Sequence, residues 1–160
     1  MKEIDYNDIE EFKFLKNNIL NEKNNTVSHL IKILTNTVCP KIRDEIAFLL
    51  VDNFKDNSII PTLKILIKRK DLLNYNANLV YAFGEYSTNE DHLDFLVDIV
   101  LDCEYHPALN AFNIITDMKL PLSENNIKLQ LQKINSKTIQ GEKEGLVKDL
   151  IQFFNDISEK

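Results

Sequence analysis

"IRDEIAFLLVDNFKDNSIIPTLKILI", residues 42–67, and "YNANLVYAFGEYSTNEDHLDFLVDIV", residues 75–100, superimpose at an offset of 33 positions without a gap. The superposition places Ile46 on Leu79, Leu50 on Phe83 and Leu63 on Leu96, so that apolar positions coincide. Each segment has a helical apolar period, a short polar turn and a second helical period. The sequence therefore predicts an internal repeat of two helices. A third copy, starting at His106, requires an insertion around "KLPL", residues 119–122.

The rest of the chain also has helical periodicity, and no segment has the pattern of a β-hairpin. Glycine and proline number only three and four in 160 residues, whereas turn-rich β-sandwiches and barrels need many more. Pro40 fits the first turn of a helix, and Ser58 and Ser123 are candidate helix caps. We predict one all-α domain over residues 1–160 with about eight to nine helices. These helices are expected at about 6–20, 27–34, 40–54, 59–67, 74–86, 91–103, 107–118, 123–136 and 143–157.

The repeated pattern resembles the HEAT-repeat family, and the segments "IRDEIAFLL…IIPTLKIL" and "NLVYAFGEY…HLDFLVDIV" carry the resemblance. It implies a right-handed solenoid of stacked antiparallel helix pairs, a fold that usually binds other macromolecules. Two positions depart from the family pattern. Val51 stands where the family has a small residue, and Pro61 lies one position late. Gly84, opposite Val51 at the offset of 33, is expected where first helices of adjacent repeats approach closely.

The formal net charge of −6 disfavours nonspecific binding to nucleic acid or to an anionic membrane, because both need a cationic face. No apolar run approaches the roughly 18 residues of a membrane span, and the first residues are acidic without an apolar signal core. Cys39 and Cys103 are far apart and have no disulfide framework pattern. We therefore expect a cytoplasmic protein with reduced thiols.

The acidic residues concentrate in one segment. Between Asp71 and Met118 the chain has nine acidic residues and no Lys or Arg. In the helix predicted at 91–103, Leu93, Leu96, Val97, Val100 and Leu101 form the apolar stripe. Four carboxylates, which we call the acidic ridge, fall on the opposite side: Asp91, Asp94, Asp98 and Asp102.

Two interpretations of the acidic ridge stay open. It is either a solvated face, partly neutralised by Lys64 and Lys68, or an electrostatic docking surface for a basic protein. Like charges four residues apart destabilise a helix, so stability alone does not favour the ridge. Among nearby aromatic residues, Tyr75 and Tyr86 share the Leu79 face and are expected in the core, whereas Tyr81 points elsewhere. The predicted partner-binding residues are Tyr81, Glu85, Glu90, Asp91, Asp94, Asp98 and Asp102.

The sequence contains no recognisable catalytic motif, phosphate-binding loop or HExxH metal site, and we predict no enzyme activity and no cofactor. Cys103 and His106 could be imagined as metal ligands, but no second ligand pair has usable spacing, so no metal site is predicted.

These features predict a non-enzymatic protein-binding module. The HEAT resemblance extends to small acidic bacterial immunity proteins or antitoxins, and implies that the ridge would cover the cationic cleft of a nuclease-type toxin. The alternatives are a generic scaffold or adaptor, or a HEAT-like enzyme such as a pigment lyase or a DNA-repair glycosylase. A glycosylase would need a cationic groove and stacking aromatic residues, which the acidic centre and the absence of Trp argue against.

Overall fold

A computed structural model describes Glu10 and residues 23–54, 56–72, 75–86, 89–118 and 121–158. Within these residues it contains eight α-helices, three short 3-10 helices and no strand, so the predicted all-α class is confirmed. The helix predicted at 6–20 lies outside the described residues apart from Glu10. The chain divides into two compact units, residues 1–86 and 87–160, which are described separately. None of the described helices is long and apolar enough to cross a membrane.

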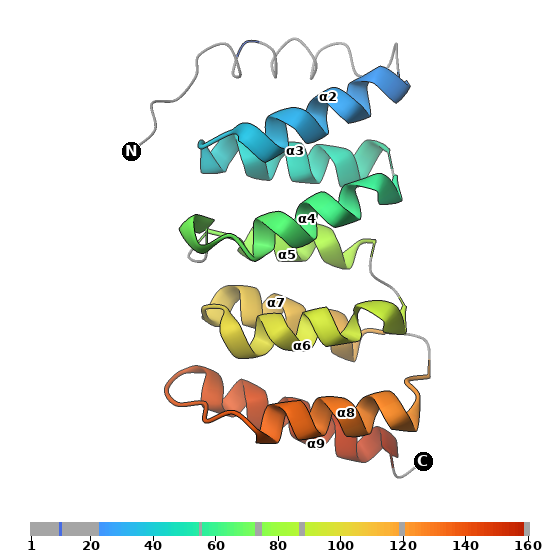
Figure 1. Cartoon of the computed structure of the whole chain (residues 1–160), viewed down its shortest axis with the longest axis vertical. Helices are drawn as coiled ribbons and strands as arrows, with labels where there is room; N and C mark the ends of the chain where they lie inside the picture. Colours follow the sequence, from blue (N-terminus) through green and yellow to red (C-terminus); the bar gives the residue numbers. More distant parts are fainter. Residues whose placement is uncertain are drawn as a thin grey trace. The chain divides into compact units, whose positions relative to one another are not determined.

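The first unit contains two helical hairpins. The helices α2 and α3 form one hairpin, α4 and α5 form the other, and the two helices of each hairpin run in opposite directions (Figure 1). Between the hairpins, α2 contacts α4 and α3 lies along α5. The bounds are α2 Lys23–Asn36, α3 Pro40–Asn53, α4 Ile60–Ile67 and α5 Ala77–Gly84, with the 3-10 helices η1 Asn57–Ile59 and η2 Lys70–Leu72.

The offset of 33 reappears as the separation between residues that touch. Asp44 of α3 accepts a hydrogen bond from Asn78 of α5, 34 positions away, at 2.8 Å. The rings of Phe48 and Tyr81, 33 positions apart, also meet. The α3 and α5 helices therefore run side by side in the register that the repeat predicts.

Side-chain donors close the helix ends of the first unit. The buried Asn76 donates from Nδ2 to the carbonyl of Ile67, at the end of α4, at 2.9 Å. Arg69 donates from Nη1 to the carbonyl of Thr35, near the end of α2, at 3.3 Å. Each bond satisfies a carbonyl that has no partner inside its own helix.

Apolar side chains between the hairpins form the core of the first unit, and several of them are fully inaccessible. Burial of one such side chain contributes about 1.5–3 kcal/mol to stability. The largest are Leu30, Leu34, Ile46, Leu50, Ile59, Leu63, Leu66, Ile67, Leu79 and Phe83.

Three details of the first unit differ from the sequence prediction. Ser58 is not a cap, because Asp56 accepts the Ser58 N–H at 2.9 Å and a 3-10 turn precedes α4. Tyr75 is 61% exposed and lies before α5, so the helical period that placed it in the core does not apply. Gly84 is the last residue of α5 rather than an interior residue of a helix that runs to 86, and its close approach to an adjacent helix stays a prediction. Pro40 does occupy the first turn of α3, as predicted.

The second unit also contains two helical hairpins, α6 with α7 and α8 with α9 (Figure 1). Between these hairpins, α6 contacts α8 and α7 contacts α9. Ser123 caps α8 as predicted, but α7 begins two residues before Pro107, which lies within its first turn. The bounds are η3 Glu90–His92, α6 Leu93–Asp102, α7 Tyr105–Thr116, α8 Glu124–Asn135 and α9 Lys143–Ser158.

The observed hairpins differ in phase from the predicted repeats. The predicted unit 42–67 joins α3 and α4, which belong to neighbouring hairpins, rather than the two helices of one hairpin. A superposition at a fixed offset gives the length of the repeating unit. It does not show at which residue the unit begins. The right-handed solenoid and the single-domain organisation stay predictions.

Candidate partner-binding surface

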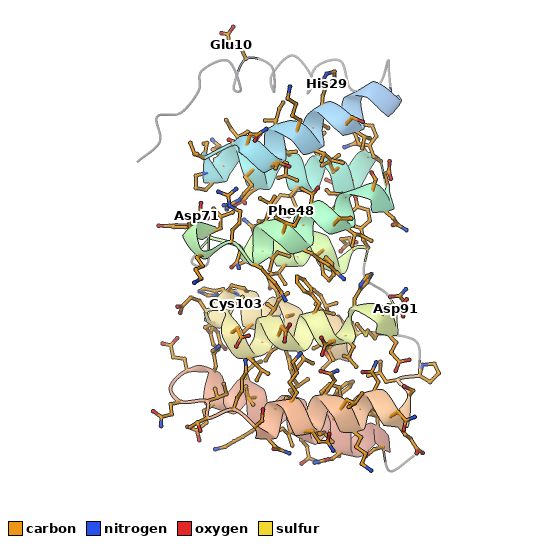
Figure 2. The ribbon with its side chains drawn as sticks, in the orientation of Figure 1. Glu10, His29, Phe48, Asp71, Asp91 and Cys103 are labelled. Carbon is orange, nitrogen blue, oxygen red and sulfur yellow. The ribbon has the colours of Figure 1, made fainter. Side chains whose placement is uncertain are left out.

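The acidic ridge begins in η3 and follows the side of α6 that faces α8 and solvent. Figure 2 shows Asp91 and Cys103 near the two ends of this helix. The predicted apolar stripe of α6 is buried, and Phe95 and Ile99 are buried as well. Because so much of α6 is enclosed, Asp94, Asp98 and Asp102 are its only side chains that are not buried.

Two lysines of α8 and the turn after it pair with three of the four ridge carboxylates. Lys133 places Nζ 2.7 Å from Asp94 Oδ1 and 2.5 Å from Asp98 Oδ1. Lys137 pairs with Asp102 in the same way. The side chains of Asp94 and Asp102 nevertheless stay 68% and 57% exposed. The ridge therefore connects α6 to α8 and the turn after it by ion pairs, while Asp94 and Asp102 stay accessible to solvent.

The electrostatics of Lys133 follow from its position between two carboxylates. Burial acts to lower its pKa, but the hydrogen bonds and charges of Asp94 and Asp98 outweigh that effect and raise the pKa. Asp91 is exposed, and within the described part of the chain it accepts one hydrogen bond, from Asn89 at 3.3 Å. Four carboxylates facing two lysines leave the ridge with a formal charge of −2.

Glu90 has a structural contact that the sequence prediction did not include. Its Oε1 accepts from the backbone N–H of Ser123 at 2.8 Å and from the Ser123 hydroxyl at 2.5 Å. The Ser123 hydroxyl also accepts from the N–H of Asn126 as the cap of α8. These bonds lower the pKa of Glu90 and connect the start of α6 to the start of α8.

Lys143, the first residue of α9, completes the far end of α6. Its Nζ donates to the carbonyls of Val100, Leu101 and Cys103 at 3.3, 2.8 and 2.6 Å. A cation at a helix C-terminus is favourable, because the terminal carbonyls carry partial negative charge. Burial of the amine lowers its pKa. Lys143 therefore joins α9 to the end of α6.

The other two predicted residues, Tyr81 and Glu85, belong to the first unit. Tyr81 of α5 is 52% exposed, in agreement with its predicted outward direction. Its ring meets that of Phe48 of α3 at 5.9 Å between centroids and an interplanar angle of 67°. Glu85 follows α5 directly and is exposed.

Two further carboxylates act with Glu85 on the same hydroxyl, that of Tyr86, and sequence reasoning did not select them. Burial raises the pKa of Tyr86 to about 12, and the charges of Asp56, Asp52 and Glu85 add to the effect. All three carboxylates are therefore electrostatically close to one hydroxyl. The Tyr86 oxygen is itself buried without a hydrogen-bond partner in the described part of the chain. The register between α3 and α5 could have identified Asp52, because it stands 33 positions before Glu85.

Cys103 and His106 do not form part of a larger donor set. Cys103 is buried at the end of α6, and the exposed His106 lies in the first turn of α7 with its ring 5.8 Å from that of Tyr105. Among the residues with described positions, no group of three or more His, Cys, Asp or Glu side chains could hold a metal ion.

Comparison with protein-family models, with curated proteins and with solved structures finds no match for this chain. The HEAT resemblance therefore rests on the repeat in the sequence alone.

Proposed function

We propose that this chain is a non-enzymatic module that binds a basic protein, and that it acts as a bacterial immunity protein against a nuclease-type toxin. The observation that carries the proposal is the charge of the acidic ridge, which its ion pairs with α8 reduce but do not cancel. Such a surface attracts a cationic cleft from a distance, and it excludes nucleic acid from the cleft once it is bound.

The distribution of charge along the chain supports the same proposal. Residues 1–86 contain twelve acidic and twelve basic residues, whereas residues 87–160 contain thirteen acidic and seven basic residues. The second unit therefore carries the full net charge of −6. A basic partner would be steered to this unit, at a rate that falls as salt screens the field.

The test begins with capture of partners by the tagged chain, followed by purification of each captured protein. Calorimetry with the purified pair should give stoichiometric binding, and an equimolar amount of this chain should stop nucleic-acid cleavage by the partner. Binding without inhibition would favour a scaffold or adaptor. Substrate turnover by this chain alone would favour a pigment lyase or glycosylase. Failure of every purified candidate to bind stoichiometrically would overturn the proposal.

Matched charge variants test the role of the ridge. Lys137→Gln makes the ridge more negative, and Asp91→Asn makes it less negative without breaking an ion pair. Lys148→Gln is the control, because it removes the same charge from α9, where the described partner of Lys148 is Glu144. Association should be faster for Lys137→Gln, slower for Asp91→Asn and nearly unchanged for the control. Equal rates for all three variants, or rates independent of salt, would contradict docking on the ridge.

A further inference from the structure

The α3 and α5 helices present an aromatic pair near two exposed carboxylates. Phe48 and Tyr81 touch edge to face, and this contact uses at most one face of the Tyr81 ring. Tyr81 is 52% exposed, and Phe48 is half-buried behind it. A large exposed aromatic ring supported by a second ring is the kind of side chain that anchors protein interfaces.

One helical turn further on, α3 carries Asp52, and Glu85 directly follows the last residue of α5. Asp52 follows Phe48 by four residues and Glu85 follows Tyr81 by four, so the contact between the rings brings the two acids to neighbouring positions. Both are exposed, and neither forms an ion pair with a cation in the described residues. We call Phe48, Asp52, Tyr81 and Glu85 the aromatic–acidic face.

The ends of two parallel helices add to the negative potential at this place. The α3 helix ends at Asn53 and α5 ends at Gly84, so the C-terminal carbonyls of both lie beside Asp52 and Glu85. Helix C-termini carry partial negative charge and favour a nearby cation. The face thus combines an aromatic surface, two carboxylates that have no ion pair among the described residues, and two negative helix ends, and its charge complement is a cation.

We infer that the aromatic–acidic face binds an arginine side chain of a basic partner, with the guanidinium stacked on Tyr81 and hydrogen-bonded to Asp52 and Glu85. This inference rests on the proposed function, and it names an arginine of the basic partner as the residue that anchors the complex. Arginine fits better than lysine for two reasons. Its planar guanidinium stacks on an aromatic ring, and its fork of N–H donors reaches two carboxylates at once.

The test uses blocked hexapeptides of alternating glycine and arginine, with lysine and citrulline versions, titrated into the full ¹⁵N-labelled chain. The arginine peptide should shift amide resonances of residues 48–53 and 78–86, more strongly than lysine and much more strongly than the neutral citrulline. Tyr81→Ala, or Asp52→Asn with Glu85→Gln, should weaken binding at least about threefold, since a cation–π contact and a carboxylate hydrogen bond each exceed about 0.6 kcal/mol. Asp117→Asn with Asp149→Asn is the control, because it removes two charges from exposed acids of the second unit.

Several results would overturn the inference. They are equal binding of citrulline and arginine peptides, shifts centred on the acidic ridge, or equal weakening by the control variant. Circular dichroism of each variant separates loss of binding from loss of fold. A purified basic partner whose affinity is unchanged by the variants of the aromatic–acidic face would refute the inference and leave the proposed function standing. If the arginine peptide binds at this face but no basic protein binds the chain, the inference would stand and the proposed function would be refuted.

Discussion

Phe48 and Tyr81 stand 33 positions apart in the chain, and their rings meet edge to face with centroids 5.9 Å apart. The same offset superimposes the two repeated segments of the sequence. The contact therefore connects the repeat with the packing of α3 along α5. Equivalent positions in successive helices become neighbours in space, and their side chains determine what this face of the first unit presents to solvent.

This aromatic contact should have a measurable coupling energy. Phe48→Ala and Tyr81→Ala each remove one ring, and the double variant should be less destabilised than the sum of the two by about 0.5–1.5 kcal/mol. Denaturant unfolding of the four proteins gives the coupling. Additive effects would mean that the two rings contribute independently, and the close register of α3 and α5 at this point would then be in question.

The buried guanidinium of Arg43 should be essential to the first unit. Its side chain is 2% exposed, it donates from Nε and Nη2 to Asp44 Oδ1 at 3.3 and 3.2 Å, and Nη2 also donates to the Tyr75 carbonyl. Arg43→Met leaves the half-buried Asp44 without its cation, so we expect a loss of about 3 kcal/mol in the free energy of unfolding. Lys41→Met, at an exposed position of the same helix, should change it by less than about 0.5 kcal/mol. Similar stabilities for both variants would show that the pairing around Arg43 is not needed.

The hydroxyl of Tyr86 should not contribute to the stability of the folded chain at neutral pH. Because its oxygen is buried without a hydrogen-bond partner among the described residues, Tyr86→Phe should leave the stability unchanged or raise it by about 1 kcal/mol. Its raised pKa, about 12, also sets a pH dependence. The protonated hydroxyl is favoured in the folded chain, so the contribution to stability is complete below the unfolded pKa of about 10 and is lost as the pH rises towards 12.

Thermal unfolding between pH 9 and 12 checks the Tyr86 prediction. The wild-type chain should lose more stability over this range than Tyr86→Phe does. Tyr81→Phe is the control, because its ring is largely exposed and removal of its hydroxyl should have little effect. Destabilisation by Tyr86→Phe at neutral pH would mean that the hydroxyl has a bonding partner in solution.

Much of the fold follows from the sequence. The spacing of apolar residues along a helix and the residues that mark its ends are both local features of the chain. The helices were predicted with ends mostly within a few residues of those observed, and Pro40 and Ser123 lie where their chemistry places them. Tyr75 was assigned wrongly to the core because the predicted helix began three residues before α5 does. The pairing of helices into hairpins was not predicted correctly, because an internal repeat gives the length of the repeating unit but not the residue at which the unit begins.

The surroundings of the ridge could be predicted only in part. Its four carboxylates follow from helix geometry, but their pairing with Lys133 and Lys137 depends on how α8 lies along α6. The contacts of Lys133 and Lys137 with the ridge span 35 to 39 positions, whereas Glu90 meets Ser123 at 33, so the repeat offset alone does not identify the two lysines. Lys133 and Lys137 are four apart, as are Asp94 and Asp98 and also Asp98 and Asp102, and this matched spacing was the available signal.

The amine of Lys143 should contribute more to stability than an ordinary surface lysine. Lys143→Gln cannot satisfy all three carbonyls at the end of α6, and we expect a loss of about 1–3 kcal/mol. Lys148→Gln removes the same charge from the same helix but breaks only an exposed pair with Glu144, so its effect should be close to zero. Hydrogen exchange of the α6 amides and denaturant unfolding measure both variants. Equal losses of stability in the two variants would show that Lys143 does not cap α6.

Glu90 should make the second unit sensitive to acid. Its pKa is lowered by the hydrogen bonds from Ser123, so its contribution to stability is complete above the unfolded pKa of about 4.3 and is lost as the pH falls through the folded pKa. Glu90→Gln keeps an oxygen acceptor but loses the charge. The variant should therefore be less stable than wild type at pH 7, and the difference should shrink below about pH 4. Unfolding from pH 7 to pH 2.5 measures this difference, with Glu104→Gln as control because Glu104 is exposed and makes no side-chain cap bond to α7. A difference that persists unchanged at pH 2.5 would show that the charge of Glu90 is not what holds the starts of α6 and α8 together.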